Sequence, residues 1–100
     1  MITIKAQKLL GFKDKTLGLM FTKIPKAVYM ETSIGIHTFF VKFPIDVVLL
    51  DKENKVIKTK QNLKPNRVFI WSKLKALVIE LPEGEIDNKK IKLGETIKLI

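Results

Sequence analysis

Asp46 is the residue of this chain whose position most demands a chemical explanation. It interrupts the apolar run Ile45–Leu50, and if that run is a strand, Asp46 shares a face with Val48 and Leu50. A buried carboxylate without partners is strongly destabilising. Asp46 therefore either accepts hydrogen bonds from backbone N–H groups of the preceding Lys42–Pro44 turn or belongs to a ligand-binding or catalytic site.

Glu80 presents the same problem within the apolar stretch Leu77–Leu81, which we expect to be a central strand. Held close together, Asp46 and Glu80 could form an acid–base pair, because neighbouring carboxylates split their pKa values. They could equally lie apart, each beside Lys42 or Arg67. The spacing alone leaves both arrangements open.

His37 is the sole histidine, and the chain has no cysteine. One histidine could still join Asp46, Glu80 or Glu31 around a divalent cation, but a structural or exposed histidine is the favoured interpretation, and we expect no metal site. Neither a Walker loop nor a Gly-x-Gly-x-x-Gly segment is present, so we expect no nucleotide cofactor.

The basic residues raise the question of nucleic acid. Nineteen Lys and Arg against ten Asp and Glu give a formal charge of +9, yet Arg67 is the sole arginine. Specific nucleic-acid sites favour arginine, so we expect at most weak, sequence-independent binding that salt abolishes. Among the aromatic residues, Phe39 is expected in the core and Trp71 at the surface, where it could stack on a base.

Short strand-like segments dominate the chain and must position these residues. Alternation, apolar runs and turn residues predict strands at 2–6, 27–31, 36–41, 45–50, 56–63 (near an edge), 68–71, 74–81 and 96–100, with helical turns near 13–21 and 85–90. The expected fold is mainly β (α+β at most): a curled, mostly antiparallel sheet or barrel of about seven short strands. Residues 1–100 form a single domain.

The location predicted from composition is cytoplasmic. The longest aliphatic run is Val47–Leu50, far short of the ~18 residues that a membrane-spanning helix needs. The N-terminus lacks the apolar core of a signal peptide. A soluble protein without a membrane partner is therefore expected.

Four segments, in chain order, resemble the motifs of one known family. They are Gly18–Phe21 (GLMF), His37–Asp51 (HTFFVKFPIDVVLLD), Leu63–Arg67 (LKPNR) and Val78–Gly84 (VIELPEG). Together they resemble the DUF192 family, also called UPF0127, over roughly residues 16–99. The resemblance implies a small β-rich domain of unknown function and adds no reaction. It also suggests that the second and fourth segments lie close together in space.

These observations favour a non-enzymatic β domain that binds a small anionic ligand or a partner. The polar cleft expected to hold the ligand is formed by His37, Thr38, Lys42, Asp46, Arg67 and Glu80. One alternative is a nucleic-acid-binding barrel that uses its lysines and Trp71. The other is a hydrolase-like enzyme that uses Asp46 and Glu80. No residue pattern identifies a reaction.

Overall fold

Nine short strands and one four-residue helix make up the described part of the computed structural model, which covers residues 1–8, 27–32, 35–37, 43–71 and 76–100. The elements are β1 (Ile2–Ile4), β2 (Gln7–Lys8), β3 (Val28–Thr32), β4 (Gly35–His37), β5 (Ile45–Leu50), β6 (Val56–Leu63), β7 (Val68–Ile70), β8 (Ala76–Pro82), α2 (Glu85–Asn88) and β9 (Ile97–Leu99).

The centre of the fold is a five-stranded sheet with the strand order β2-β3-β8-β5-β6. All six residues of β5 are buried, as expected of an apolar strand with neighbours on both sides. β8 lies in the middle of the sheet and pairs antiparallel with β3 and β5. The prediction that the strand of Glu80 is central is therefore confirmed.

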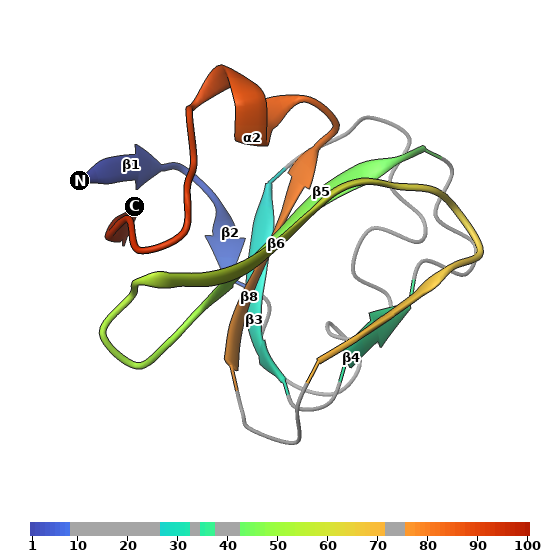
Figure 1. The fold of residues 1–100 in the computed structure, drawn as a ribbon, viewed down its shortest axis with the longest axis horizontal. Coiled ribbons are helices and arrows are strands. Elements are labelled where there is room, and N and C mark those ends of the chain that lie inside the picture. Colours follow the sequence, from blue (N-terminus) through green and yellow to red (C-terminus); the bar gives the residue numbers. More distant parts are fainter. Residues whose placement is uncertain (9–26, 33–34, 38–42, 72–75) are drawn as a thin grey trace.

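The two faces of this sheet carry separate parts of the core. We call the first the Glu80 face; its cluster includes Val28, Val47 and Val78. The opposite Asp46 face carries a cluster that includes Val48 and Ile79. Figure 1 shows the sheet nearly edge-on with β6 foremost, β1 and α2 on one side, and β4 on the other.

A pair of terminal strands covers part of the Asp46 face. β1 and β9 pair in parallel, with Ile2 opposite Ile97 and Ile4 opposite Leu99. Ile4 and Ile97 belong to the buried cluster of that face, so the two chain ends are held by the core. No helix in the described ranges is long and apolar enough to cross a bilayer.

The structure confirms the mainly β fold and corrects several details. β5 and β6 have the predicted bounds, and β6 is an edge strand. The strands do not close into a barrel, because they form one five-stranded and two two-stranded sheets. The parallel pairs β1–β9 and β2–β3 were not expected, because alternation within one strand carries no information on strand direction. The helical turn predicted near 13–21 lies outside the described residues.

Candidate functional site

The Asp46 carboxylate accepts three backbone hydrogen bonds from two distant segments. Oδ1 accepts the N–H of Asn62 at 3.0 Å, and Oδ2 accepts those of Gly84 at 3.1 Å and Ile86 at 3.0 Å. Asp46 is only 1% exposed, so these bonds form almost out of contact with water. The prediction that Asp46 accepts a hydrogen bond within the fold is confirmed.

These bonds stabilise two irregular turns. Asn62 and Gly84 both have positive φ, 54° and 91°, a conformation that glycine adopts freely and asparagine more readily than most other residues. Ile86 lies in the first turn of α2, where backbone N–H groups have no partner within the helix. Asp46 therefore ties β6 and the start of α2 to β5, which is a structural role.

The donors to Asp46 differ from the expected ones. We expected the Lys42–Pro44 turn to donate, whereas the donors in the described residues lie on β6 and at the start of α2. Lys42 itself lies outside the described residues. The contact with Gly84 also confirms that the second and fourth family-like segments lie close in space, as does the antiparallel pairing of β5 with β8.

Glu80 lies on the other face, among aliphatic side chains. Its direct neighbours across the sheet are Val28 on β3 and Val47 on β5. It is 6% exposed, so it does not point to bulk solvent. Burial raises the pKa of Glu80 from 4.5 to about 7, and no described residue stabilises the ionised carboxylate.

The sheet itself separates Asp46 from Glu80. In the β5–β8 register, Asp46 lies opposite Leu81, and Val47 lies opposite Glu80. Residues that face each other across a ladder point to the same side, and successive residues point to opposite sides. Asp46 and Glu80 therefore point away from each other. The acid–base pair on which the hydrolase interpretation depends does not form, and the expected cleft cannot contain both.

The remaining predicted site residues are only partly covered by the structure. His37 pairs its backbone with Val68 in the β4–β7 ladder, and its side chain is not described. Thr38 and Lys42 lie outside the described residues. Arg67 is exposed at the turn between β6 and β7, where its Nη1 donates to the Asn66 carbonyl at 3.3 Å. The proposed grouping of these residues around Glu80 stays a prediction.

Sequence reasoning missed a lysine in line with Glu80. Val28, Glu80, Val47 and Lys60 occupy one row across four adjacent strands. With strands ~4.8 Å apart, the Cα atoms of Lys60 and Glu80 are separated by about 10 Å. Lys58 lies on the same face, opposite Leu49. The alternation of Lys58 and Lys60 was visible in the sequence, but only the register aligns Lys60 with Glu80.

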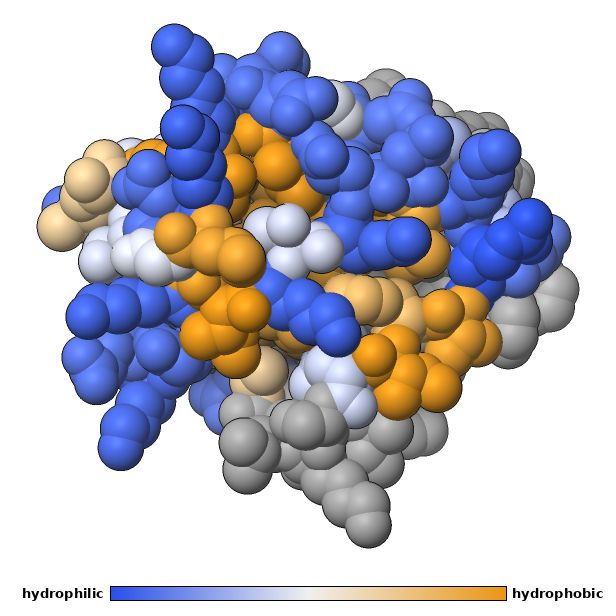
Figure 2. Space-filling model, in the orientation of Figure 1, coloured by the Kyte–Doolittle hydropathy of each residue, from blue (hydrophilic) through white to orange (hydrophobic). Residues whose placement is uncertain are grey.

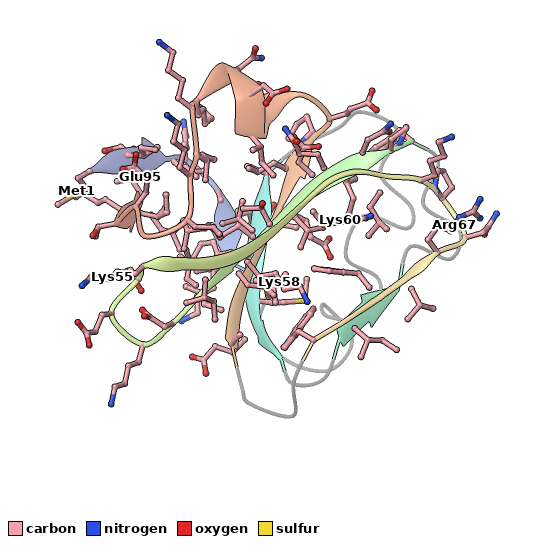
Figure 3. All side chains as sticks on the ribbon, in the orientation of Figure 1. Met1, Lys55, Lys58, Lys60, Arg67 and Glu95 are labelled. Atoms are coloured by element: carbon pink, nitrogen blue, oxygen red, sulfur yellow. The ribbon has the colours of Figure 1, made fainter. Side chains whose placement is uncertain are left out.

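Two aromatic side chains pack on the same face, and one of them lies beside Lys58. The rings of Phe69 and Trp71 are 5.7 Å apart, and both pack against the cluster of the Glu80 face. The Lys58 ammonium lies 5.4 Å from the centre of the Phe69 ring. Figure 3 shows Lys58 and Lys60 projecting from β6 toward the side of β7. Trp71 is half-buried: part of it is exposed, as expected, and part packs against the core.

Trp71 also carries an unsatisfied donor. Its Nε1–H is buried and has no hydrogen-bond partner in the described structure. Buried N–H groups are nearly always paired, and an unpaired one is destabilising by about 1–3 kcal/mol. The Glu80 face thus combines an ionisable acid in an apolar setting with a free indole donor.

The opposite face carries an open cavity of about 640 Å³ near the chain termini. Its apolar part includes Tyr29, Leu77 and Leu99, while Lys8 and Lys98 contribute positive charge and Glu53 negative charge. The mixture of charges favours no single class of ligand. This cavity lies away from the Glu80 face and includes none of the predicted site residues.

Comparison with known proteins agrees with the fold. Residues 2–99 match the DUF192 family, described as "Uncharacterized ACR". This chain belongs to the DUF192 family. UPF0127 protein PH1112 of Pyrococcus horikoshii is 37% identical over 94 residues, covering 88% of this chain and 81% of the relative. UPF0127 protein PF1050 of Pyrococcus furiosus is 30% identical over 95 residues, covering 88% and 80%.

A solved structure shows the same DUF192-like arrangement of strands. A protein of unknown function from Novosphingobium aromaticivorans superposes with a TM-score of 0.76 at 16% identity, covering 94% of this chain and 71% of that one. At that identity the likeness establishes the fold alone. The family resemblance inferred from the four sequence segments is confirmed.

Proposed function

We propose that this DUF192 chain is a non-enzymatic binding domain whose Glu80 face takes a compact anionic ligand. The observation that carries the proposal is that one face holds both a buried carboxyl in an apolar setting, Glu80, and the buried Nε1–H of Trp71, which has no hydrogen-bond partner in the described residues. Binding sites commonly combine an apolar lining with a few polar groups that fix the ligand.

The charge of the site favours an anion. The Trp71 indole can only donate a hydrogen bond. Glu80, with its pKa raised to about 7 by burial, can also donate when it is protonated. Lys58 and Lys60 on the same face add positive charge at the solvent side, and the +9 chain attracts anions from a distance. A carboxylate or phosphate group would accept from all of these donors.

Two other functions have less support. The hydrolase alternative needs Asp46 and Glu80 together, and they lie on opposite faces. Nucleic-acid binding through Trp71 needs a free ring, whereas this ring packs against the core cluster. Weak, salt-sensitive binding to nucleic acid through the lysines stays a prediction.

The experiment uses Trp71 as its own probe, since it is the sole tryptophan. We would titrate the protein with acetate, benzoate, citrate and inorganic phosphate at pH 6 and pH 8, and record tryptophan fluorescence and melting temperature. Binding by at least one of them, stronger at pH 6 because protonated Glu80 does not repel an anion, is the expected result.

Matched variants separate the site from general charge effects. Glu80→Gln removes the ionisable group with almost no change in size. Glu83→Gln makes the same change at an exposed position two residues before α2 begins. Glu80→Gln should abolish the pH dependence of binding, while Glu83→Gln should keep it. If no anion in the set binds, or if the two variants behave alike, the proposed function is wrong.

A further inference from the structure

β6 forms one outer edge of the five-stranded sheet and has eight residues. Its inner side pairs with β5. On its outer side, the N–H of Val56 donates to Glu95 at 2.8 Å, and the carbonyl of Val56 accepts from Gly94 at 2.8 Å. Beyond Val56, no backbone hydrogen bond from another described segment reaches this edge. Within the described part of the chain, residues 57–63 therefore offer a strand edge without a backbone partner.

β7 does not occupy this edge, although it follows β6 directly in the chain. It pairs with β4 in a separate two-stranded sheet. Figure 1 shows β6 and β7 diverging from the turn that joins them, with β6 at the front of the molecule. The segment 94–95 already pairs with the first residue of β6, so the edge accepts an added backbone where one is present.

The side chains around the edge are exposed and of two kinds. Along β6, Lys58 and Lys60 are exposed, and Ile57 is 53% exposed. Across the turn, Val68 and Ile70 on β7 are 53% and 61% exposed. Figure 2 shows the resulting mixture of hydrophilic and hydrophobic surface at the front of the molecule, where β6 lies.

The charged side chains of β6 itself are all positive, and Asp87 of α2 contacts the strand only at Gln61 among the described residues, accepting its Nε2–H at 2.8 Å. Lys58 and Lys60 are two residues apart and lie on one face, with Thr59 between them on the other. β6 contains no acidic residue. A strand that paired with β6 would place alternate side chains beside these two lysines. Acidic residues at alternate positions, with β-branched residues between them, fit this arrangement.

We propose that the outer edge of β6, residues 57–63, binds an extended acidic segment of another protein by strand addition. Main-chain hydrogen bonds would provide the affinity, and the alternating acidic side chains would provide the selectivity through Lys58 and Lys60. This surface shares Lys58 and Lys60 with the Glu80 face, but backbone pairing along the edge needs neither the Glu80 carboxyl nor the Trp71 indole and does not depend on the ligand proposed for them.

Two other occupants of such an edge fit it less well, one because of charge and one because of side-chain shape. In a β6–β6 pair between two copies of this chain, lysines would lie near lysines, which is one way in which edge strands avoid self-association. A single-stranded nucleic acid needs flat rings on which its bases stack. The exposed apolar side chains here, Ile57, Val68 and Ile70, are aliphatic.

The test measures binding of a fluorescent peptide, Glu-Val-Glu-Val-Glu with blocked ends, by anisotropy and by amide shifts in the NMR spectrum. We expect saturable binding and the largest shifts at residues 57–61. The charge-reversed peptide Lys-Val-Lys-Val-Lys should not bind. A peptide with N-methyl groups on alternate amides keeps every charge but cannot pair along that edge, and it should bind at least tenfold more weakly.

Protein variants test the same proposal from the other side. The double variant Lys58→Glu/Lys60→Glu should lose at least tenfold in affinity for the acidic peptide and gain binding of the basic one. The matched control Lys92→Glu/Lys98→Glu changes the net charge equally at two other exposed lysines and should bind as the wild type does.

Four outcomes would overturn the proposal. They are equal loss in both double variants, equal binding of the N-methylated peptide, shifts confined to residues outside 57–63, and a single-stranded oligothymidine that displaces the peptide at a lower concentration than the unlabelled peptide does. The N-methyl comparison uses the wild-type protein, so it decides the matter even if a variant fails to fold.

Discussion

Replacing Asp46 with alanine should destabilise this domain more than any other single change of a polar side chain in its described part. The substitution removes the acceptor of three backbone N–H groups, those of Asn62, Gly84 and Ile86. The loss affects both turns that these groups belong to, one leading out of β6 and one leading into α2. β5 itself should keep its pairing with β8, because that ladder uses backbone groups only.

The size of the effect follows from the exposure of the three donors. The bond to Ile86 is buried, and those to Asn62 and Gly84 are partly buried. An orphaned buried donor costs about 1–3 kcal/mol, and donors that reach water cost less. The sum is about 3 kcal/mol of unfolding free energy. For a domain of about 100 residues this corresponds to a fall in Tm of roughly 12–24 °C.

The assay is urea unfolding followed by circular dichroism and Trp71 fluorescence, with two comparison variants. Asp46→Asn keeps one acceptor oxygen and should lose an intermediate amount. Asp87→Ala removes an exposed carboxylate that accepts only the Gln61 side chain, at 2.8 Å, and should cost less than about 1 kcal/mol. If Asp46→Ala is as stable as Asp87→Ala, the structural role assigned to Asp46 is refuted.

Three further predictions concern single positions. Burial raises the pKa of Glu80 from 4.5 to about 7, so the folded protein keeps this proton at pH values where the unfolded chain has lost it. The stability that the proton confers is therefore full below pH 4.5 and is lost as the pH rises through 7. Glu80→Gln cannot lose this proton, so its unfolding free energy relative to that of the wild type should rise by ~3 kcal/mol between pH 4.5 and pH 8. Parallel pH profiles of the two proteins in urea unfolding would contradict the raised pKa. Gly84→Ala should cost about 1–2 kcal/mol through its φ of 91° alone, since an added Cβ meets no atom within 4 Å; a variant as stable as wild type in thermal unfolding would show that the turn relaxes. Ile79→Ala, at a fully buried position of β8, should lower the unfolding free energy by about 2–5 kcal/mol. Ile57→Ala, at the exposed edge, should change it by less than about 0.5 kcal/mol. Equal losses would contradict the assignment of Ile79 to the core and Ile57 to the edge.

The sequence alone was enough to locate most of the strands in the described ranges. Ile45–Leu50 is apolar without interruption apart from Asp46, and it forms a strand that is buried throughout. Val56–Leu63 is apolar at its two ends and mostly polar between them, and it forms an edge strand in which Val56 and Leu63 alone are buried. In both cases burial follows from side-chain hydrophobicity along one strand, which is a local property.

The partners of Asp46 could not be found in this way. Its donors lie 16, 38 and 40 residues further along the chain. Nothing near Asp46 in the sequence marks them, except that Gly84 is a residue able to adopt positive φ. The expectation that a nearby turn would donate failed because the chain folds α2 back onto β5.

The sequence by itself determined that two carboxylates, Asp46 and Glu80, stand in apolar strands and must be specially accommodated. It also determined the family, through segments that the structure brings together at β5 and β8. Only the tertiary structure decided that the two carboxylates face opposite sides, because that depends on the register that pairs Val47 with Glu80. A register shift of one residue between β5 and β8 would have placed the two carboxylates on the same face. Register is fixed by contacts among strands distant in sequence.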